Sequence, residues 1–106
     1  IYLSILIIEW VMFEFSGFQR DLLYCIAGLD GSHGLGIKRA LEDYGDTEIN
    51  HGRLYPNLDT LVEEGYVEKG SIDDRTNSYE LTSEGRALLA DRREWEAKQL
   101  SETDTE

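Results

Sequence analysis

The polar residues with the clearest chemical capacity lie between positions 50 and 57: Asn50, His51, Arg53, Tyr55 and Asn57. An arginine can pair with both acceptors on the major-groove edge of guanine, and an asparagine can pair with adenine. Each such pair contributes about 1–3 kcal/mol of base discrimination. Arg53 is the main candidate. Asn50 could instead only cap a helix, Tyr55 could contact a phosphate or only pack, and His51 could make an exposed polar contact or respond to pH.

Cations elsewhere in the chain are candidates for binding phosphate groups: Lys38, Arg39, Lys69 and Arg75. Backbone N–H groups at helix starts also bind phosphate. Gly34 and Gly36 would allow a close approach there. The same stretch lacks the Gly-Lys-Ser/Thr of a P-loop and has no strand before it, so we do not expect a nucleotide site.

Catalysis and metal binding have little support in the composition. A single cysteine, Cys25, excludes an intramolecular disulfide, and with only two histidines there is no Cys/His zinc cluster. We expect no cofactor. Cys25 falls on an apolar helical stripe, which favours a buried thiol over a redox switch, since a switch needs an exposed thiolate of low pKa. The sequence therefore does not indicate an enzyme.

Net charge is the unusual bulk property of these 106 residues. Twenty-two acidic against ten basic residues give −12 at pH 7, and only three of the cations are lysines. Such a balance normally argues against a polyanionic partner. It also suits a protein that stays soluble in concentrated salt, where the screening length falls to about 3 Å at 1 M. Composition alone leaves both interpretations open.

Three helices are predicted before any strand. Ser16 and Gln19 form a capping-box pattern, followed by apolar positions at helical spacing as far as Leu29. A second helix is expected over residues 34–44, with these residues inward: Leu35, Ile37, Ala40, Leu41 and Tyr44. Asn50 can cap a third helix that Gly65 closes, with Pro56 tolerated near its start.

The pattern then changes to two short strands, around residues 66–72 and 78–81, joined by a charged turn. Thr82 can cap a closing helix over residues 83–100, and the tail at 101–106 is expected to be acidic and frayed. Two helices joined by a short turn form a helix-turn-helix, and a hairpin after the third helix makes it winged. The fold class is mainly α with a small β-hairpin (α+β). A small α+β domain without a nucleic-acid role is the alternative.

Three segments carry a resemblance to a known family: HGLGIKRAL at 33–41, GRLYPNLDTLVEEGYVE at 52–68 and SYELTSEGRALL at 78–89. Together they resemble the PadR family of transcriptional regulators, in its short subclass, over about residues 18–100. The acidity and low lysine content suggest a member from a halophilic archaeon. The resemblance implies a winged helix whose third helix enters the major groove, and a repressor role.

The chain departs from the family pattern at three points. Arg53 stands where the family has a small residue before Leu-Tyr-Pro, which could enhance base reading. The tip DDRTN, residues 73–77, is more acidic than the family's usual wing, and this puts the wing's contribution to affinity in doubt. The longer C-terminal region of the family is reduced to one helix.

We expect four segments: an apolar extension at 1–15, a winged helix-turn-helix at 16–82, a dimerisation helix at 83–100 and the tail. The extension is too short to span a membrane and lacks the features of a signal peptide, so it could cover an apolar surface of this chain or of a partner. The residues expected at a dimer interface lie on the last helix: Leu88, Leu89, Trp95 and Leu100.

The function predicted from the sequence is a cytoplasmic, homodimeric regulator that binds a pseudo-palindromic site on double-stranded DNA. No membrane partner is expected. The alternative is a winged-helix protein-interaction module that does not bind DNA. Arg53 favours the first prediction, and the charge of −12 favours the second.

Overall fold

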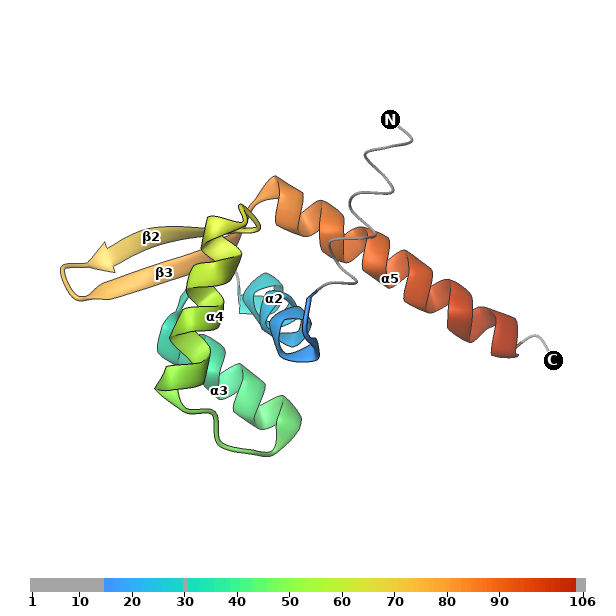
Figure 1. Ribbon diagram of the computed structural model, residues 1–106, viewed down its shortest axis with the longest axis horizontal. Helices are drawn as coiled ribbons and strands as arrows, with labels where there is room; N and C mark the ends of the chain where they lie inside the picture. The colour runs from blue at the N-terminus through green and yellow to red at the C-terminus, as the bar shows by residue number, and fades with distance from the viewer. Residues whose placement is uncertain (1–14, 30, 105–106) are drawn as a thin grey trace.

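A computed structural model describes residues 15–29 and 31–104 of the chain (Figure 1). The elements, in order, are α2 (Gly17–Leu29), β1 (Ser32–His33), α3 (Gly34–Gly45), α4 (His51–Glu63), β2 (Val67–Asp73), β3 (Thr76–Leu81) and α5 (Ser83–Asp104). Helices α2, α3 and α4 pack together, the hairpin of β2 and β3 extends to one side, and α5 extends to the other (Figure 1). We call β2, β3 and the turn between them the wing. The apolar extension predicted at 1–15 lies outside the described residues, apart from Phe15.

Local side-chain caps start α2, α4 and α5, as the sequence predicts. At α2, the Ser16 hydroxyl accepts from the backbone N–H of Gln19 at 3.1 Å, and the Gln19 side chain accepts from the N–H of Ser16 at 3.2 Å. The Asn50 side chain accepts from the N–H of Arg53 at 2.8 Å at the start of α4, and the Thr82 hydroxyl accepts from the N–H of Gly85 at 3.1 Å at the start of α5. Such caps satisfy N–H groups that have no partner within the helix.

Two glycines are required by the backbone, one at the end of α4 and one in the first turn of α5. Gly65 has a φ of +86°, a left-handed conformation that ends α4 and that side chains disfavour. At Gly85 a Cβ atom would collide with the backbone carbonyl oxygen of Tyr66, so only glycine lets the first turn of α5 pack against the start of the wing. These contacts give a physical reason for Gly65 in the segment at 52–68 and for Gly85 in the segment at 78–89.

One hydrophobic core joins the three central helices to the sheet and to the beginning of α5. Its fully buried side chains come from every helix and from β2: Leu22, Leu23, Ile26, Ile37, Leu54, Leu58, Leu61, Val67 and Leu88. Tyr79 of β3 is also buried. Because α4 is held in this core through Leu54, Leu58 and Leu61, its remaining faces point outward in a fixed orientation.

The sheet has a strand that the sequence analysis did not predict. β1 pairs antiparallel with β3, with Ser32 opposite Tyr79 and His33 opposite Ser78, so that the strand order is β1-β3-β2. A two-residue strand has no sequence period, and only its pairing with β3 makes it a strand. β1 ties the start of α3 to the wing.

The structure corrects the predicted inward face of the second helix and the end of the last one. Leu35 and Tyr44 are 41% and 79% exposed, and α3 buries Ile37 and Leu41. α5 continues to Asp104 rather than ending at Leu100, so the first residues of the expected tail are helical. None of the helices in the described ranges is long and apolar enough to cross a membrane.

Candidate nucleic-acid interface

Helix α4 presents its polar residues on both sides of an outward face. Arg53 is exposed on the side toward α2, and Tyr55 is half-buried on the side toward the wing. His51 is exposed near the helix start, and its ring lies 5.6 Å from that of Tyr55. The side-chain oxygen of Asn50 accepts from the backbone N–H of Arg53, so Asn50 acts as the cap of α4.

The guanidinium of Arg53 lies over the aromatic ring of Phe18, on α2. The distance from its Cζ atom to the ring centroid is 4.0 Å. In the part of the chain that the structure describes, this guanidinium makes no hydrogen bond and no ion pair, so its N–H donors remain available. An exposed arginine whose Cζ atom is held over an aromatic ring and whose donors are free is well suited to recognise a guanine edge.

Asn57 is engaged with its own chain. Its Oδ1 atom accepts from Nε2 of Gln19 at 3.1 Å, and its Nδ2 atom donates to the backbone carbonyl of Arg53 at 2.7 Å. A bidentate contact with adenine needs both of these atoms. In this conformation Asn57 links α2 to α4, and base reading would require it to leave both partners.

A groove of about 440 Å³ separates α4 from the wing. Its walls are formed by the start of α3, one turn of α4 and the end of the wing: His33, Gly34, Leu35, Tyr55, Arg75, Thr76, Asn77 and Tyr79. The Tyr55 hydroxyl fills the space where a Cβ on Gly34 would lie, which explains a glycine at this position. The groove therefore brings together three predicted features: the glycine at the helix start, Tyr55 and Arg75.

The start of α3 is capped by a residue that the sequence analysis did not assign. Nδ1 of His33 accepts from the backbone N–H of Gly36 at 2.9 Å and so caps the helix. His33, in β1, also pairs with Ser78 of β3. A histidine directly before a helix that starts with glycine is the only sequence signal for this role.

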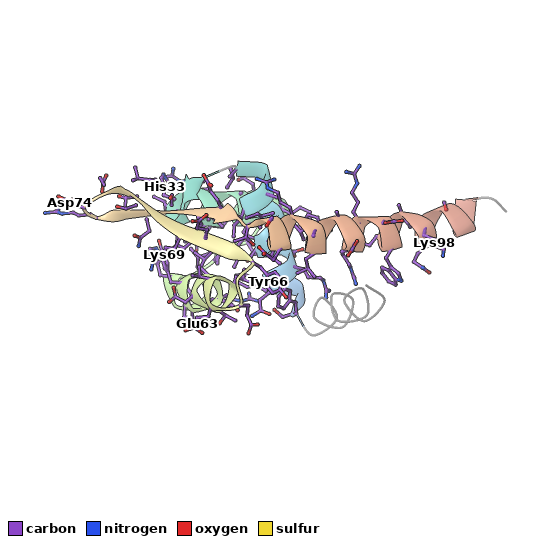
Figure 2. All side chains as sticks on the ribbon, turned by 90° about the horizontal axis from the view of Figure 1, so that it is seen from above. His33, Glu63, Tyr66, Lys69, Asp74 and Lys98 are labelled. Atoms are coloured by element: carbon purple, nitrogen blue, oxygen red, sulfur yellow. The ribbon has the colours of Figure 1, made fainter. Side chains whose placement is uncertain are left out.

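The four candidate phosphate-binding cations differ in their surroundings. The Lys38 ammonium forms an ion pair with Glu42 at 3.0 Å, so it is partly neutralised, whereas Arg39 is exposed on the same helix. Lys69 is exposed on β2, and Arg75 lies in the turn of the wing. Figure 2 shows Lys69 between the body of the domain and the far tip of the wing at Asp74.

The acidic tip of the wing has a structural role that its composition did not reveal. The Asp73 carboxylate accepts from the backbone N–H of Arg75 at 2.9 Å. This bond, with hydrogen bonds from Thr76, lowers the pKa of Asp73 below its ordinary value. Asp73 therefore closes the turn that presents Arg75, while the Asp74 carboxylate remains exposed beside it.

The helix expected to form the dimer interface is divided into two parts. Leu88 and Leu89 are 1% and 6% exposed within this chain, so they are core residues and not free interface residues. Further along, Trp95 is 52% and Leu100 67% exposed, and the Arg92 guanidinium lies 4.6 Å from the Trp95 ring centroid. Only these two of the four predicted residues remain available to a partner.

The thiol of Cys25 and the side chains that could bind a metal ion are the remaining groups to consider. Cys25 is half-buried, and burial, followed by the negative charge of Asp21, raises the pKa of its thiol. This environment favours the neutral thiol, as expected for a packing residue. Among the described residues there is no group of three His, Cys, Asp or Glu side chains that could hold a metal ion.

Comparisons with known proteins agree with this architecture. The model of the transcriptional regulator PadR-like family matches residues 22–91. The structure of RosR from H. salinarum, grown from NaBr, has a TM-score of 0.77 and 48% identity, over 81% of this chain and 77% of that one. A complex structure of hsRosR-S1 has a TM-score of 0.78 and 48% identity, over 81% and 76%. No curated protein matches the chain. The family resemblance and the winged-helix fold predicted from the sequence are confirmed.

Proposed function

The chain belongs to the PadR-like family of transcriptional regulators and is a DNA-binding regulator rather than an enzyme; from this premise we propose that it is a cytoplasmic homodimeric repressor that reads a pseudo-palindromic operator through Arg53. In a helix-turn-helix, residues near the start of the recognition helix face the base edges. Arg53 is the third residue of α4.

The state of the Arg53 side chain carries the proposal. The guanidinium is exposed and supported on Phe18, and it has no competing carboxylate among the residues described. Each arginine–guanine pair contributes about 1–3 kcal/mol of discrimination. The other polar residues of this helix are less free, since Asn50 caps it and Asn57 bonds to Gln19.

The residues that line the groove beside α4 could hold the backbone of one DNA strand. Arg75 supplies a positive charge on the wing side, the start of α3 supplies backbone N–H groups, and the Tyr55 hydroxyl lies between them. These are the groups that bind phosphate oxygens without reading sequence. We assign the positioning of the backbone to this groove and the reading of bases to Arg53.

Homodimer formation is supported by the exposed apolar residues at the far end of α5. The C-terminal part of α5, which carries Trp95 and Leu100, is exposed at both residues, and α5 extends away from the three-helix core (Figure 1). A two-fold dimer would cover them and would place two copies of α4 at successive major-groove faces, about 34–36 Å apart. The preferred site would then be pseudo-palindromic.

The charge of −12 is compatible with DNA binding if the protein works in concentrated salt. There the repulsion between exposed carboxylates and phosphates is screened within about 3 Å at 1 M, while direct contacts in a partly buried interface persist. The structure also gives Asp73 a role in the turn rather than at the phosphate groove.

The test compares Arg53→Ala with Arg75→Ala. Both variants are titrated against a duplex selected with the wild-type protein and against a scrambled duplex, at several salt concentrations. Arg53→Ala should lower the ratio of specific to scrambled affinity by about 5- to 150-fold, which corresponds to 1–3 kcal/mol. Arg75→Ala should weaken both duplexes alike and reduce the slope of log affinity against log salt by about 0.9.

A matched control removes the same charge far from the proposed interface. Arg93→Ala on α5 should leave both the affinity ratio and the salt slope unchanged. Equal weakening of both duplexes by Arg53→Ala would make Arg53 a phosphate contact and contradict the base-reading assignment. Failure of the wild-type protein to bind any duplex over the salt series would favour a protein-interaction module.

A further inference from the structure

The first turn of α2 contacts the recognition helix at two points. Phe18 lies beneath the guanidinium of Arg53, and the neighbouring Gln19 donates to Asn57, one turn further along α4. Asn57 in turn donates to the backbone carbonyl of Arg53. Two consecutive residues of α2 therefore hold both the side chain and the backbone of Arg53.

The α2 turn is itself well ordered by local bonds. The reciprocal cap between Ser16 and Gln19 fixes the backbone on either side of Phe18. The Phe18 ring is half-buried and packs against the hydrophobic core, so one of its faces is anchored while the other meets Arg53. A ring held in this way can restrict an arginine that would otherwise sample many conformations.

We propose that Phe18 is a positioning residue for sequence recognition: its ring holds the Arg53 guanidinium in the orientation that reads a base. The proposal rests on the DNA-reading role proposed above for Arg53. A guanidinium that stacks by its face keeps its N–H donors at the edge, where a bidentate contact with guanine needs them. Phe18 then contributes to specificity without touching DNA.

The expected change in the affinity ratio follows from the strength of the cation–π contact between Phe18 and Arg53. An exposed cation–π contact contributes about two- to fivefold to an equilibrium constant. Phe18→Leu keeps an apolar side chain in the core but removes the aromatic face. It should therefore lower the ratio of specific to scrambled affinity by about two- to fivefold, and leave the affinity for scrambled DNA unchanged.

The experiment is a double-mutant cycle between positions 18 and 53, measured with the selected and scrambled duplexes. Phe18→Leu should lower the affinity ratio in the wild-type background and have no further effect in Arg53→Ala. Phe18→Tyr, which keeps the ring, should retain the wild-type ratio. Phe15→Leu is the matched control, because Phe15 lies three residues away and its ring contacts Tyr66 rather than Arg53.

The outcomes separate this inference from the function on which it rests. If Arg53→Ala leaves the affinity ratio unchanged, both are wrong. If Arg53→Ala lowers the ratio but Phe18→Leu does not, or if Phe18→Leu has the same effect in both backgrounds, only the positioning role is wrong.

A spectroscopic measurement covers the case in which Phe18→Leu does not fold. In the free wild-type protein, the ring current of Phe18 should shift the side-chain protons of Arg53 upfield in the NMR spectrum. Phe18→Met then replaces Phe18→Leu in the cycle. Arg53 protons at ordinary chemical shifts would overturn the proposal without any variant.

Discussion

Helices α4 and α5 both carry side chains proposed to bind a partner, but these side chains differ in the contacts that they make within the chain. On α4, Arg53 is stacked on Phe18, Asn57 is bonded to Gln19 and Asn50 caps the helix. On the far part of α5, Leu100 is exposed, and Trp95 is 52% exposed with the Arg92 guanidinium over its ring. Figure 2 shows how far Lys98, in that part of α5, lies from the wing and its tip at Asp74.

The difference indicates two kinds of binding surface. If Arg53 reads a base, as we propose, contacts from α2 within the same chain already orient it before DNA binds. An exposed tryptophan gains most from a partner that removes its apolar surface from water. Under the function proposed above, the first surface would be complete in one subunit, whereas the second would need another copy.

The largest expected effect is a loss of stability, and it tests where the hydrophobic core ends along α5. Leu88→Ala removes a fully buried side chain and should lower the free energy of unfolding by about 2–5 kcal/mol. Chemical unfolding monitored by circular dichroism measures this loss. The loss should stay the same over a hundredfold dilution of the protein, because the contact lies within one chain.

Leu100→Ala is the control for that prediction, since it makes the same change on the exposed part of α5. It should alter stability by less than about 0.5 kcal/mol at the lowest protein concentration. A loss at Leu100 as large as that at Leu88, and independent of dilution, would remove the distinction between the two parts of α5.

The next effect concerns the exposed apolar residues on the far part of α5. Trp95→Ala should weaken the dimer about 30-fold or more, which corresponds to the roughly 2 kcal/mol typical of a central interface tryptophan. Sedimentation over a concentration series measures the dissociation constant. Tyr44→Ala, which removes another highly exposed aromatic from α3, should leave it unchanged. A wild-type protein that stays monomeric at micromolar concentration would refute the prediction.

The smallest effect concerns the turn that leads into α4. The Glu42 carboxylate accepts from the backbone N–H of Ile49 at 2.9 Å and pairs with Lys38, and these contacts lower the pKa of Glu42 below 4.5. A lowered carboxyl pKa stabilises the folded state above the unfolded value, and this contribution is lost as the pH falls through the folded value. Wild type should therefore be more stable than Glu42→Gln at pH 7, and the difference should shrink below pH 4.5.

Urea unfolding of both proteins between pH 7 and pH 3 measures that difference. Lys38→Gln serves as the control, because it removes the ion pair and keeps the bond from Ile49, the larger cause of the shift. Lys38→Gln should abolish only part of the pH dependence. A constant difference between wild type and Glu42→Gln across the range would contradict the prediction.

Much of the fold could be predicted because its signals are local. The caps at Ser16, Asn50 and Thr82 act within three residues, so their pattern is visible in the chain. The hairpin and the order of the helices follow from periodicity for the same reason. Arg53 could be selected as a candidate reader from its residue type and its place near a helix start.

The inward face of α3 and the division of α5 could not be predicted in this way. Leu35 and Leu41 are equally apolar in sequence, but only Leu41 meets the core. Leu88 and Trp95 stand seven residues apart and were expected on the same dimer face, yet α5 leaves the core between them. Burial depends on where the neighbouring elements end, which no local pattern records.

The sequence by itself determined the helix starts, the wing, the family resemblance and the identity of the candidate reader, because each depends on residues close together in the chain. Only the tertiary structure decided that β1 pairs with β3, that Leu88 and Leu89 belong to the core, and that Phe18 supports Arg53. Those contacts join residues more than thirty positions apart or depend on the packing of several elements at once. Their energy becomes available only after the helices and strands have assembled around one core.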